Sequence, residues 1–327
     1  MSANRLTRAC LLAAFIQASA PGAFADDVKR MGILFAGSAA QRSNLEEVLF
    51  IALKQQGYVE GRNLQVTRRY AAGDYPRLAG YARELESMKP DVVVTMCTPS
   101  TRAMTQASSG IPIVMTMIAD PVGQHLIESL ARPGGNLTGT ASMQDELIPK
   151  MLEAFAAVVP PQGRIAVLYN TSNSIHARLW AAAEAGAGPL KLRVKRYDVA
   201  GPDTVPEALK AIARDKQQGV FVLPDDPMLT GQRAAIVEFG VRQRIPTLHA
   251  TSEFVDAGGL MAYGQSFADG YRVAAGYVDR ILKGTKPENM PVAQPTKFDL
   301  SVNVKVAREI GVEIPQALLM RADKIVE

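Results

Sequence analysis

Cysteine, histidine and tryptophan are scarce in this sequence of 327 residues, which has two cysteines, three histidines and one tryptophan. Only Cys97 lies outside the N-terminal segment considered below, and a single cysteine forms no internal disulfide. The histidines, His125, His176 and His249, follow no metal-ligand spacing. We therefore expect neither a metal site nor a disulfide framework, and a fold that rests on its hydrophobic core.

The common catalytic and nucleotide-binding motifs are also missing. The sequence has no HExxH, no GxxxxGK[ST], no CxxC and no GxGxxG after a strand. The nearest pattern is GQSFA at residues 264–268, which approaches the GxSxG nucleophile elbow at a strand-to-helix turn. Its fifth residue is alanine and no ordered His and acid complete a triad, so we interpret Ser266 as a helix N-cap. The sequence predicts no enzyme and no cofactor, with a Ser266-dependent hydrolase as the alternative.

A strong charge bias is absent as well. The formal net charge is +4, with 47% hydrophobic and 21% charged residues, which is ordinary for a globular protein. Lysine and arginine form no cluster, so we exclude nucleic acid as a partner. The length exceeds one ordinary core and is sufficient for two α/β lobes.

Residues 1–25 resemble a secretory signal peptide. Arg5 and Arg8 precede an apolar segment, Ala9–Ala20, and AFA at 23–25 fits a small-x-small cleavage site. The apolar segment is too short to remain as a membrane anchor. We predict a periplasmic protein whose mature chain begins at residue 26, the alternative being a buried N-terminal helix.

Two short apolar runs, Asp91–Met96 and Ile111–Ile118, carry the clearest structural pattern. Both are rich in Val, Ile and Met and are typical of strands buried on both faces of a parallel sheet. The residues between them, Ser100–Ser108, predict a helix with Thr98 as its N-cap and Pro99 in its first position. This part of the chain is therefore a strand–helix–strand unit.

Polar residues follow the ends of both strands in this unit, at Thr98, Ser100, Thr101 and Asp120. In open parallel sheets ligands bind beyond the carboxyl ends of the strands, where helix N-termini present unpaired N–H groups. We therefore interpret Thr98–Thr101 and Asp120 as one wall of a small-molecule site.

Strands and helices alternate in two series of similar size. The first begins with the strand Lys29–Ala36 and ends with the strand Leu137–Ala141; the second extends to the strand Leu260–Gly264. Two such series in tandem predict two doubly wound parallel-sheet lobes. The expected helices include Tyr75–Met88 capped by Asp74, Val122–Leu130, Gln144–Val158, Thr230–Arg242, Ser252–Asp256, Phe267–Leu282 and Val304–Ile310.

The same theme of polar strand ends recurs in the second series. The strand ends of the two series are Gly37-Ser38, Thr98–Thr101 and Asp120-Pro121, then Tyr169–Asn173, Pro224–Asp226 and Tyr263-Gly264. Hydroxyls and helix-start amides suit a carboxylate, and a facing Asp suits an ammonium. Tyr169 and Tyr263 suit a planar ligand group. The alternative is that these residues are ordinary caps and turns; we favour the binding interpretation.

In these features the chain resembles the substrate-binding proteins of ABC transporters, of the type that includes tryptophan-binding members. The resemblance covers essentially the whole mature chain. It is carried by GYVEGRNL at 57–64, TP at 98–99, IPIV at 111–114, DPV at 120–122, RPGGNLTG at 132–139, GGLMAYG at 258–264, RILKG at 280–284 and QPTKF at 294–298. Related sequences often have glycine where this chain has Cys97.

The resemblance implies a periplasmic-binding-protein fold of the first type, with ligand held between two lobes that three crossovers join. The implied N-terminal lobe is 26–141 plus 264–289, and the C-terminal lobe is 142–263 plus 290–327. The implied hinge strands are Ala141–Met143, Leu260–Tyr263 and Asn289–Val292. The family pattern puts ligand contacts near Ser38, Thr98, Ser100, Asp120, Asn170, Asp225 and Tyr263.

The resulting hypothesis is a monomeric receptor that captures a zwitterionic or carboxylate-bearing solute and delivers it to an ABC permease in the inner membrane. Thr98, Ser100 and Thr101 would hold the carboxylate, and Asp225 or Asp120 the amine. Amino acids are the leading solutes. A ligand-sensing receptor module is the alternative of a different class.

Overall fold

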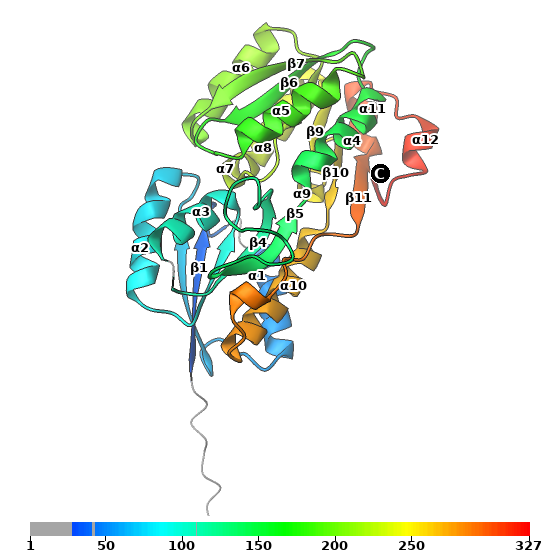
Figure 1. Cartoon of the computed structure of the whole chain (residues 1–327). Coiled ribbons are helices and arrows are strands. Elements are labelled where there is room, and N and C mark those ends of the chain that lie inside the picture. The colour runs from blue at the N-terminus through cyan, green and yellow to red at the C-terminus, as the bar shows by residue number, and fades with distance from the viewer. Residues whose placement is uncertain (1–27, 41–42, 109) are drawn as a thin grey trace, which may run out of the picture.

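The computed structural model describes residues 28–40, 43–108 and 110–327; the predicted signal peptide lies outside the described residues. The chain forms two α/β lobes (Figure 1), which confirms the predicted fold class. The first lobe has a five-stranded sheet in the order β2-β1-β3-β4-β5, and the second has a seven-stranded sheet in the order β12-β11-β10-β9-β8-β6-β7.

The first sheet is parallel throughout. It consists of β1 (Lys29–Phe35), β2 (Leu64–Tyr70), β3 (Val92–Met96), β4 (Ile113–Ala119) and β5 (Leu137–Ser142). The helices of this lobe are α1 (Ser43–Gln55), the 3₁₀ turn η1 (Tyr75–Arg77), α2 (Leu78–Ser87), α3 (Thr98–Ala107) and α10 (Phe267–Leu282). Strands β3 and β4 are buried along their whole length, as expected for strands covered on both faces.

The second sheet is parallel except where β10 and β11 pair antiparallel. Its strands are β6 (Arg164–Asn170), β7 (Arg193–Val199), β8 (Gly219–Val222), β9 (Thr247–His249), β10 (Met261–Gln265), β11 (Phe298–Asn303) and β12 (Lys324–Val326). Its helices are α4 (Gln144–Ala156), α5 (His176–Ala187), η2 (Pro202–Thr204), α6 (Val205–Arg214), α7 (Pro227–Gly231), α8 (Arg233–Gln243), α9 (Ser252–Asp256), α11 (Val304–Ile310) and α12 (Gln316–Leu319).

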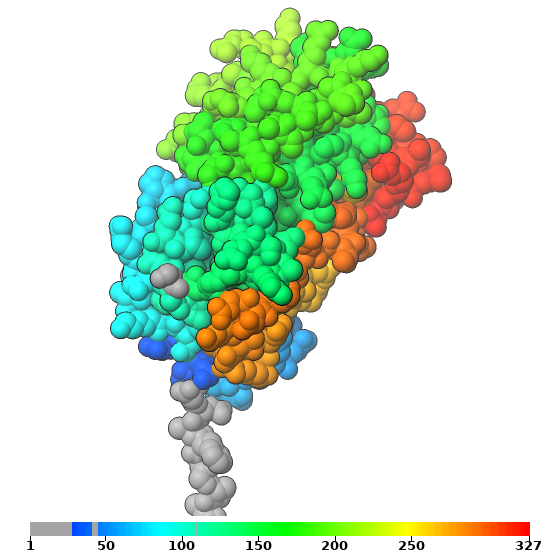
Figure 2. Space-filling model, in the orientation of Figure 1, coloured from blue at the N-terminus to red at the C-terminus, as the bar shows by residue number. Residues whose placement is uncertain are grey.

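The chain crosses between the sheets after β5, after β10, and between η3 (Pro287–Asn289) and β11. Helix α10 packs against α1, β3, β4 and β5, and thus returns to the first sheet although it follows a strand of the second. Before the third crossover the chain lies against the first lobe as far as Ala293, since Val292 donates to the Leu130 carbonyl and Ala293 pairs beside β5. Figure 2 shows the two lobes in contact, with the C-terminal residues on the second lobe.

Several predicted helices have the predicted bounds, and α9, α10 and α11 match to the residue. Ser266 caps α10 as predicted, since its Oγ accepts the Asp269 N–H at 3.3 Å. The predicted helix Val122–Leu130 is wrong, because this stretch forms turns. The Asp120 side chain accepts the Gly123 N–H at 2.9 Å, a local bond that competes with helical hydrogen bonding.

Two predicted N-caps are also wrong. Asp74 makes no side-chain capping bond, and the chain after it forms η1 before α2 begins. Helix α3 begins at Thr98 itself, with Cys97 in the N-cap position at φ 121° and ψ 162°. The Thr98 hydroxyl is therefore available for a partner outside its own helix. None of the helices in the described part of the chain has the length and apolarity that a membrane span requires.

Gly139 lies where two strands of the first sheet pack closely, so a substitution there should be destabilising. Its φ is +131°, and a Cβ at this position would lie 2.1 Å from the Met115 carbonyl oxygen of the neighbouring strand. We expect Gly139→Ala to lower the free energy of unfolding by about 3 kcal/mol, from backbone strain and overpacking. Gly276→Ala in α10 is the control: nothing lies within 4 Å of its Cβ position, so it should stabilise by about 0.5 kcal/mol or more. Urea unfolding of both variants measures this, and equal stabilities would contradict it.

Candidate ligand-binding site

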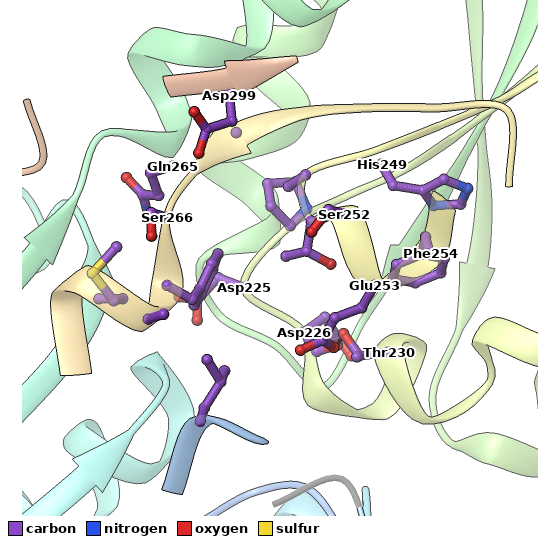
Figure 3. Close-up of a pocket in the computed structure, with 18 of the residues that line it drawn as sticks. Asp225, Asp226, Thr230, His249, Ser252, Glu253, Phe254, Gln265, Ser266 and Asp299 are labelled. Carbon is purple, nitrogen blue, oxygen red and sulfur yellow. Dashed lines mark hydrogen bonds between the residues drawn. The ribbon is translucent and has the colours of Figure 1, made fainter. Parts of the chain in front are cut away.

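A cavity of about 530 Å³ lies between the two lobes. The first lobe contributes Phe35, Met96, Cys97, Thr116, Met117, Phe267 and Tyr271, and the second contributes residues at the ends of β8, β9 and β10 together with α9. Figure 3 shows side chains from these second-lobe elements around the cavity. The carboxyl ends of two open sheets thus face each other, which is where ligands bind in such sheets.

Thr98 and Asp225 join the two lobes beside this cavity. The Thr98 hydroxyl donates to Asp225 Oδ2, and the Thr98 amide lies 3.5 Å from Asp225 Oδ1. Asp225 follows β8 with φ +56°, so the chain reverses there and directs the carboxylate toward α3. A carboxylate at a helix N-terminus is stabilised by the unpaired N–H groups and the helix dipole.

Burial raises the pKa of Asp225 to about 7, against the lowering effect of the hydrogen bonds from Thr98; the neighbouring Asp226 raises it further. The group therefore changes charge near neutral pH. A cation that entered the cavity beside it would favour the ionised form.

Asp226, the next residue, is part of the turn that holds Asp225. It is 4% exposed, and its carboxylate accepts hydrogen bonds from Asn170 Nδ2 at 2.9 Å and Asn173 Nδ2 at 3.1 Å. It also caps α7 through the Leu229 N–H at 2.8 Å. Asn173 in addition donates to the Asp225 carbonyl at 2.8 Å. The two adjacent aspartates thus have different roles, one fixing the turn and one facing the other lobe.

His176 completes this buried turn. Its Nδ1 accepts the Asn170 N–H at 2.8 Å, which leaves Nε2 to donate to the Pro224 carbonyl at 3.2 Å. Burial lowers the pKa of His176, so the ring is neutral at pH 7 in this tautomer. The ring therefore ties the end of β6 to the residue before Asp225.

The structure brings some of the predicted ligand residues together and separates others. Asp225 lines the cavity, and Thr98 is bonded to it. Thr101 donates to the Cys97 carbonyl at 3.0 Å, and Ser100 Oγ lies 3.2 Å from Cys97 Sγ. Both hydroxyls are fully buried and make contacts at the start of α3. Ser38, just after β1, is partly buried and is not among the residues that line the cavity.

Asp120 lies between the lobes but outside the cavity lining. Its Oδ2 is 2.8 Å from Nε of Arg178 on α5, and the same guanidinium lies 2.9 Å from Asp145 on α4. Arg178 is 52% exposed, so solvent screens this pair. Asp120 is therefore a contact between the lobes at their rim.

The two tyrosines and Asn170 point elsewhere. Tyr169 packs edge-on against His176 at 5.6 Å between ring centroids, beneath the Arg196 guanidinium at 4.5 Å. Tyr263 packs against the core of the second lobe. Asn170 serves the Asp226 turn. Sequence position locates these residues at strand ends, but the facing direction of each side chain depends on the packing of its strand.

Sequence reasoning missed most of the cavity lining. The second lobe supplies His249, Thr251, Ser252, Glu253 and Gln265. His249 is the last residue of β9, residues 251–253 come just after that strand, and Gln265 follows the predicted strand Leu260–Gly264, so the rule of polar strand ends applied to them as well. The aromatic residues of the first lobe gave no comparable signal, because a Phe or Tyr at helical spacing is usually part of the core.

Several buried polar groups of the cavity have no hydrogen-bond partner among the described residues. Gln265 is 4% exposed; its Oε1 accepts the Met143 N–H at 3.4 Å, while Nε2 has no acceptor. His249 is fully buried with both ring nitrogens unpartnered, and it stacks on Phe254 at 4.0 Å. Burial lowers the pKa of His249 to about 3, so the ring is neutral. Buried polar groups are rarely unsatisfied, which makes these candidates for ligand contacts.

The cavity offers little to a metal or a nucleophilic mechanism. Within residues 28–40, 43–108 and 110–327, no group of three or more His, Cys, Asp or Glu side chains is arranged to hold a metal ion. Burial raises the pKa of Cys97 to about 12, so this thiol stays protonated and is a poor nucleophile. Ser266 is engaged as the N-cap of α10.

The division of roles between the adjacent aspartates is testable. Asp226→Ala leaves Asn170 and Asn173 without their acceptor and removes the cap of α7, so we expect a loss of about 3 kcal/mol in unfolding free energy. Asp225→Ala is the matched control and should change stability by less than about 1 kcal/mol, since only Thr98 and the Ala119 backbone lose a partner and the cost of burying a carboxyl disappears with it. Chemical denaturation measures both, and a larger loss for Asp225→Ala would contradict this assignment.

A second prediction concerns the pH dependence of stability. The folded-state pKa of Asp225, about 7, lies above the value of about 3.9 for an unfolded Asp. Between these values the folded state holds a proton that the unfolded state lacks, so this group lowers stability as pH rises. Relative to Asp225→Asn, the wild type should lose on the order of 2 kcal/mol between about pH 4 and pH 7. Urea unfolding at several pH values checks this; the exposed Asp203→Asn, as control, should follow the wild-type profile.

Comparison with known proteins supports a single family. The family model described as ABC transporter substrate binding protein matches residues 40–326. A tyrosine-binding protein of Clostridioides difficile (strain R20291) is 25% identical over 264 residues, which cover 80% of this chain and 75% of that protein.

Two solved structures extend the likeness. A conserved domain protein from Vibrio cholerae matches this chain with a TM-score of 0.85 and 26% sequence identity. An ABC domain in complex with L-Trp from Streptococcus pneumonia matches it with a TM-score of 0.83 and 23% sequence identity. Each match covers 91% of this chain and 99% of the other chain. With its family model matched over most of the sequence, this chain belongs to the ABC transporter substrate-binding proteins.

Proposed function

We propose that this protein is the solute-binding component of an ABC importer, and that it holds an amino-acid-like solute in the cavity between its lobes. The observation that carries the proposal is the cavity itself, which both lobes line and in which buried Gln265 and His249 have unpartnered polar atoms. A signal peptide at residues 1–25 would deliver the protein to the periplasm, where it would pass the solute to a membrane permease as a monomer.

Hinge closure is the proposed mechanism of capture. The lobes of this chain touch through Thr98 and Asp225, through Asp120 and Arg178, and through α7, whose Met228 N–H lies 3.5 Å from Tyr75 Oη. The ligand-free, open structure of a substrate-binding protein from Clostridium difficile covers the same 91% of this chain at 26% identity, yet its TM-score is 0.60. A lower score at equal coverage is expected when two lobes are rotated apart. A ligand that contacts both lobes shifts the population toward the closed form.

An aromatic amino acid is the proposed solute. One relative is a tyrosine-binding protein and one similar structure holds L-Trp. The cavity of this chain has apolar and aromatic walls from Phe35, Phe267 and Tyr271, with Phe254 on the other lobe. Asp225, which faces the cavity beside Thr98, is the proposed partner of the solute's amine.

The test is a thermal-shift screen of the purified protein against the amino acids, followed by calorimetry on the best ligand. An aromatic amino acid at 100 times its Kd should add about 2.7 kcal/mol to the unfolding free energy. Asp225→Ala should weaken binding by about 2 kcal/mol or more, since it removes one partner of a buried charge pair. Glu207→Ala, exposed on α6, is the control and should bind as the wild type does. A library in which no amino acid stabilises the protein would refute the solute class.

A further inference from the structure

Two carboxyl groups, those of Asp225 and Glu253, belong to the cavity lining (Figure 3). Among the described residues, Asp225 receives hydrogen bonds from Thr98 and from the Ala119 backbone, and neither carboxyl forms an ion pair with Lys or Arg. Arg233 acts on Glu253 only as a more distant charge, while Asp256 opposes it. Burial raises the pKa of both groups, as expected for carboxyls that lack a counter-charge.

The cations near the cavity are already paired. Two lysines line it: Lys297 is 2.6 Å from Asp299, and Lys324 is 2.5 Å from Asp256. No arginine of the described residues belongs to the lining. The carboxyls of Asp225 and Glu253 are therefore not balanced by protein charge, and the cavity favours a positively charged occupant.

The other carboxyls of the lining already have partners: Asp256 and Asp299 pair with the two lysines, Asp226 accepts hydrogen bonds from its own turn, and Asp323 accepts the Leu300 N–H. The uncharged polar side chains of the lining include Gln265 and His249. Gln265 offers an unpartnered Nε2 donor, and His249 offers one donor and one acceptor from a neutral ring. Such groups satisfy a hydroxyl, an indole N–H or a carbonyl oxygen without neutralising an anion. A solute carboxylate in this cavity would lose its hydration shell and would lie near the like charges of Asp225 and Glu253. No unpaired cation of the lining would compensate for this loss, so binding of a carboxylate is unfavourable in a partly buried site.

We infer that this site recognises the ammonium group of its solute together with an aromatic body, and that the solute's carboxylate is dispensable. This inference rests on the proposed function, since it specifies the solute of the same cavity. The negative charge of Asp225 and Glu253 attracts the ammonium group, and the walls formed by Phe35, Phe267 and Tyr271 receive the apolar part. Aromatic primary amines, the decarboxylated forms of aromatic amino acids, are then ligands in their own right.

A matched series of ligands separates the contribution of the solute's ammonium group to binding from that of its carboxylate. Calorimetry at pH 8 with the purified protein would compare L-tryptophan, tryptamine and indole-3-propionate, and L-tyrosine, tyramine and 4-hydroxyphenylpropionate. Each series keeps the ring and removes the carboxylate or the amine in turn. We expect the amine to bind within about tenfold of the amino acid or more tightly, and the deaminated acid at least about 100-fold more weakly.

Variants test the two carboxyls directly. Asp225→Asn and Glu253→Gln keep the size of the side chain and should each weaken amine binding at least about tenfold. Glu238→Gln, exposed on α8 of the same lobe, controls for the loss of one negative charge and should leave affinity within about twofold. Circular dichroism and thermal unfolding verify that the variants are folded.

The outcomes are distinguishable. Amine binding that both carboxyl variants weaken supports the inference. If the amino acid binds tightly and the amine does not bind, the inference is overturned and the proposed function stays intact. Equal binding of the deaminated acid and the amine also overturns it. If neither amino acids nor amines bind, the inference and the proposed solute class fail together.

Discussion

The contact between Thr98 and Asp225 is the constraint on which the arrangement of this protein depends. A carboxylate from the second lobe sits at the N-terminus of α3 in the first lobe, where it meets the Thr98 hydroxyl and approaches the Thr98 amide. The contact exists only when the carboxyl ends of both sheets face each other. The same approach of the two sheets creates the cavity, so the geometry of the cavity and that of the contact cannot be separated.

The contact also explains why the surrounding turn is so extensively bonded. Asp225 has a left-handed backbone conformation and a carboxyl that is costly to bury, and each is unfavourable by itself. Asp226, Asn173 and His176 offset this with buried hydrogen bonds that fix the residues on both sides. The first aspartate can therefore face the other lobe without a cation partner, because the second holds the turn in place. A solute with a positive charge would supply the counter-charge that the protein withholds.

Much of the fold could be predicted because its signals are local. Apolar runs such as Val92–Met96 indicate buried strands, and the bounds of α10 follow from its amphipathic spacing and the N-cap Ser266. The errors arose where a local rule met a competing contact. Thr98 has the residue type of an N-cap, yet Cys97 takes that position and the Thr98 hydroxyl bonds across the lobes. The stretch after Asp120 has helical composition, yet the Asp120 side chain bonds to Gly123 and the chain turns.

The sequence by itself determined the two wound lobes, the family and the fact that polar residues gather at strand ends, because periodicity and motif order are properties of neighbouring residues. Only the tertiary structure decided which strand ends meet across the cavity. It turned Tyr169 and Tyr263 toward the second-lobe core and brought Gln265 and Glu253 to the cavity. The reason is physical: side-chain direction at a strand end depends on the packing of whole sheets, and the approach of residues 98 and 225 depends on how three crossovers position the two lobes.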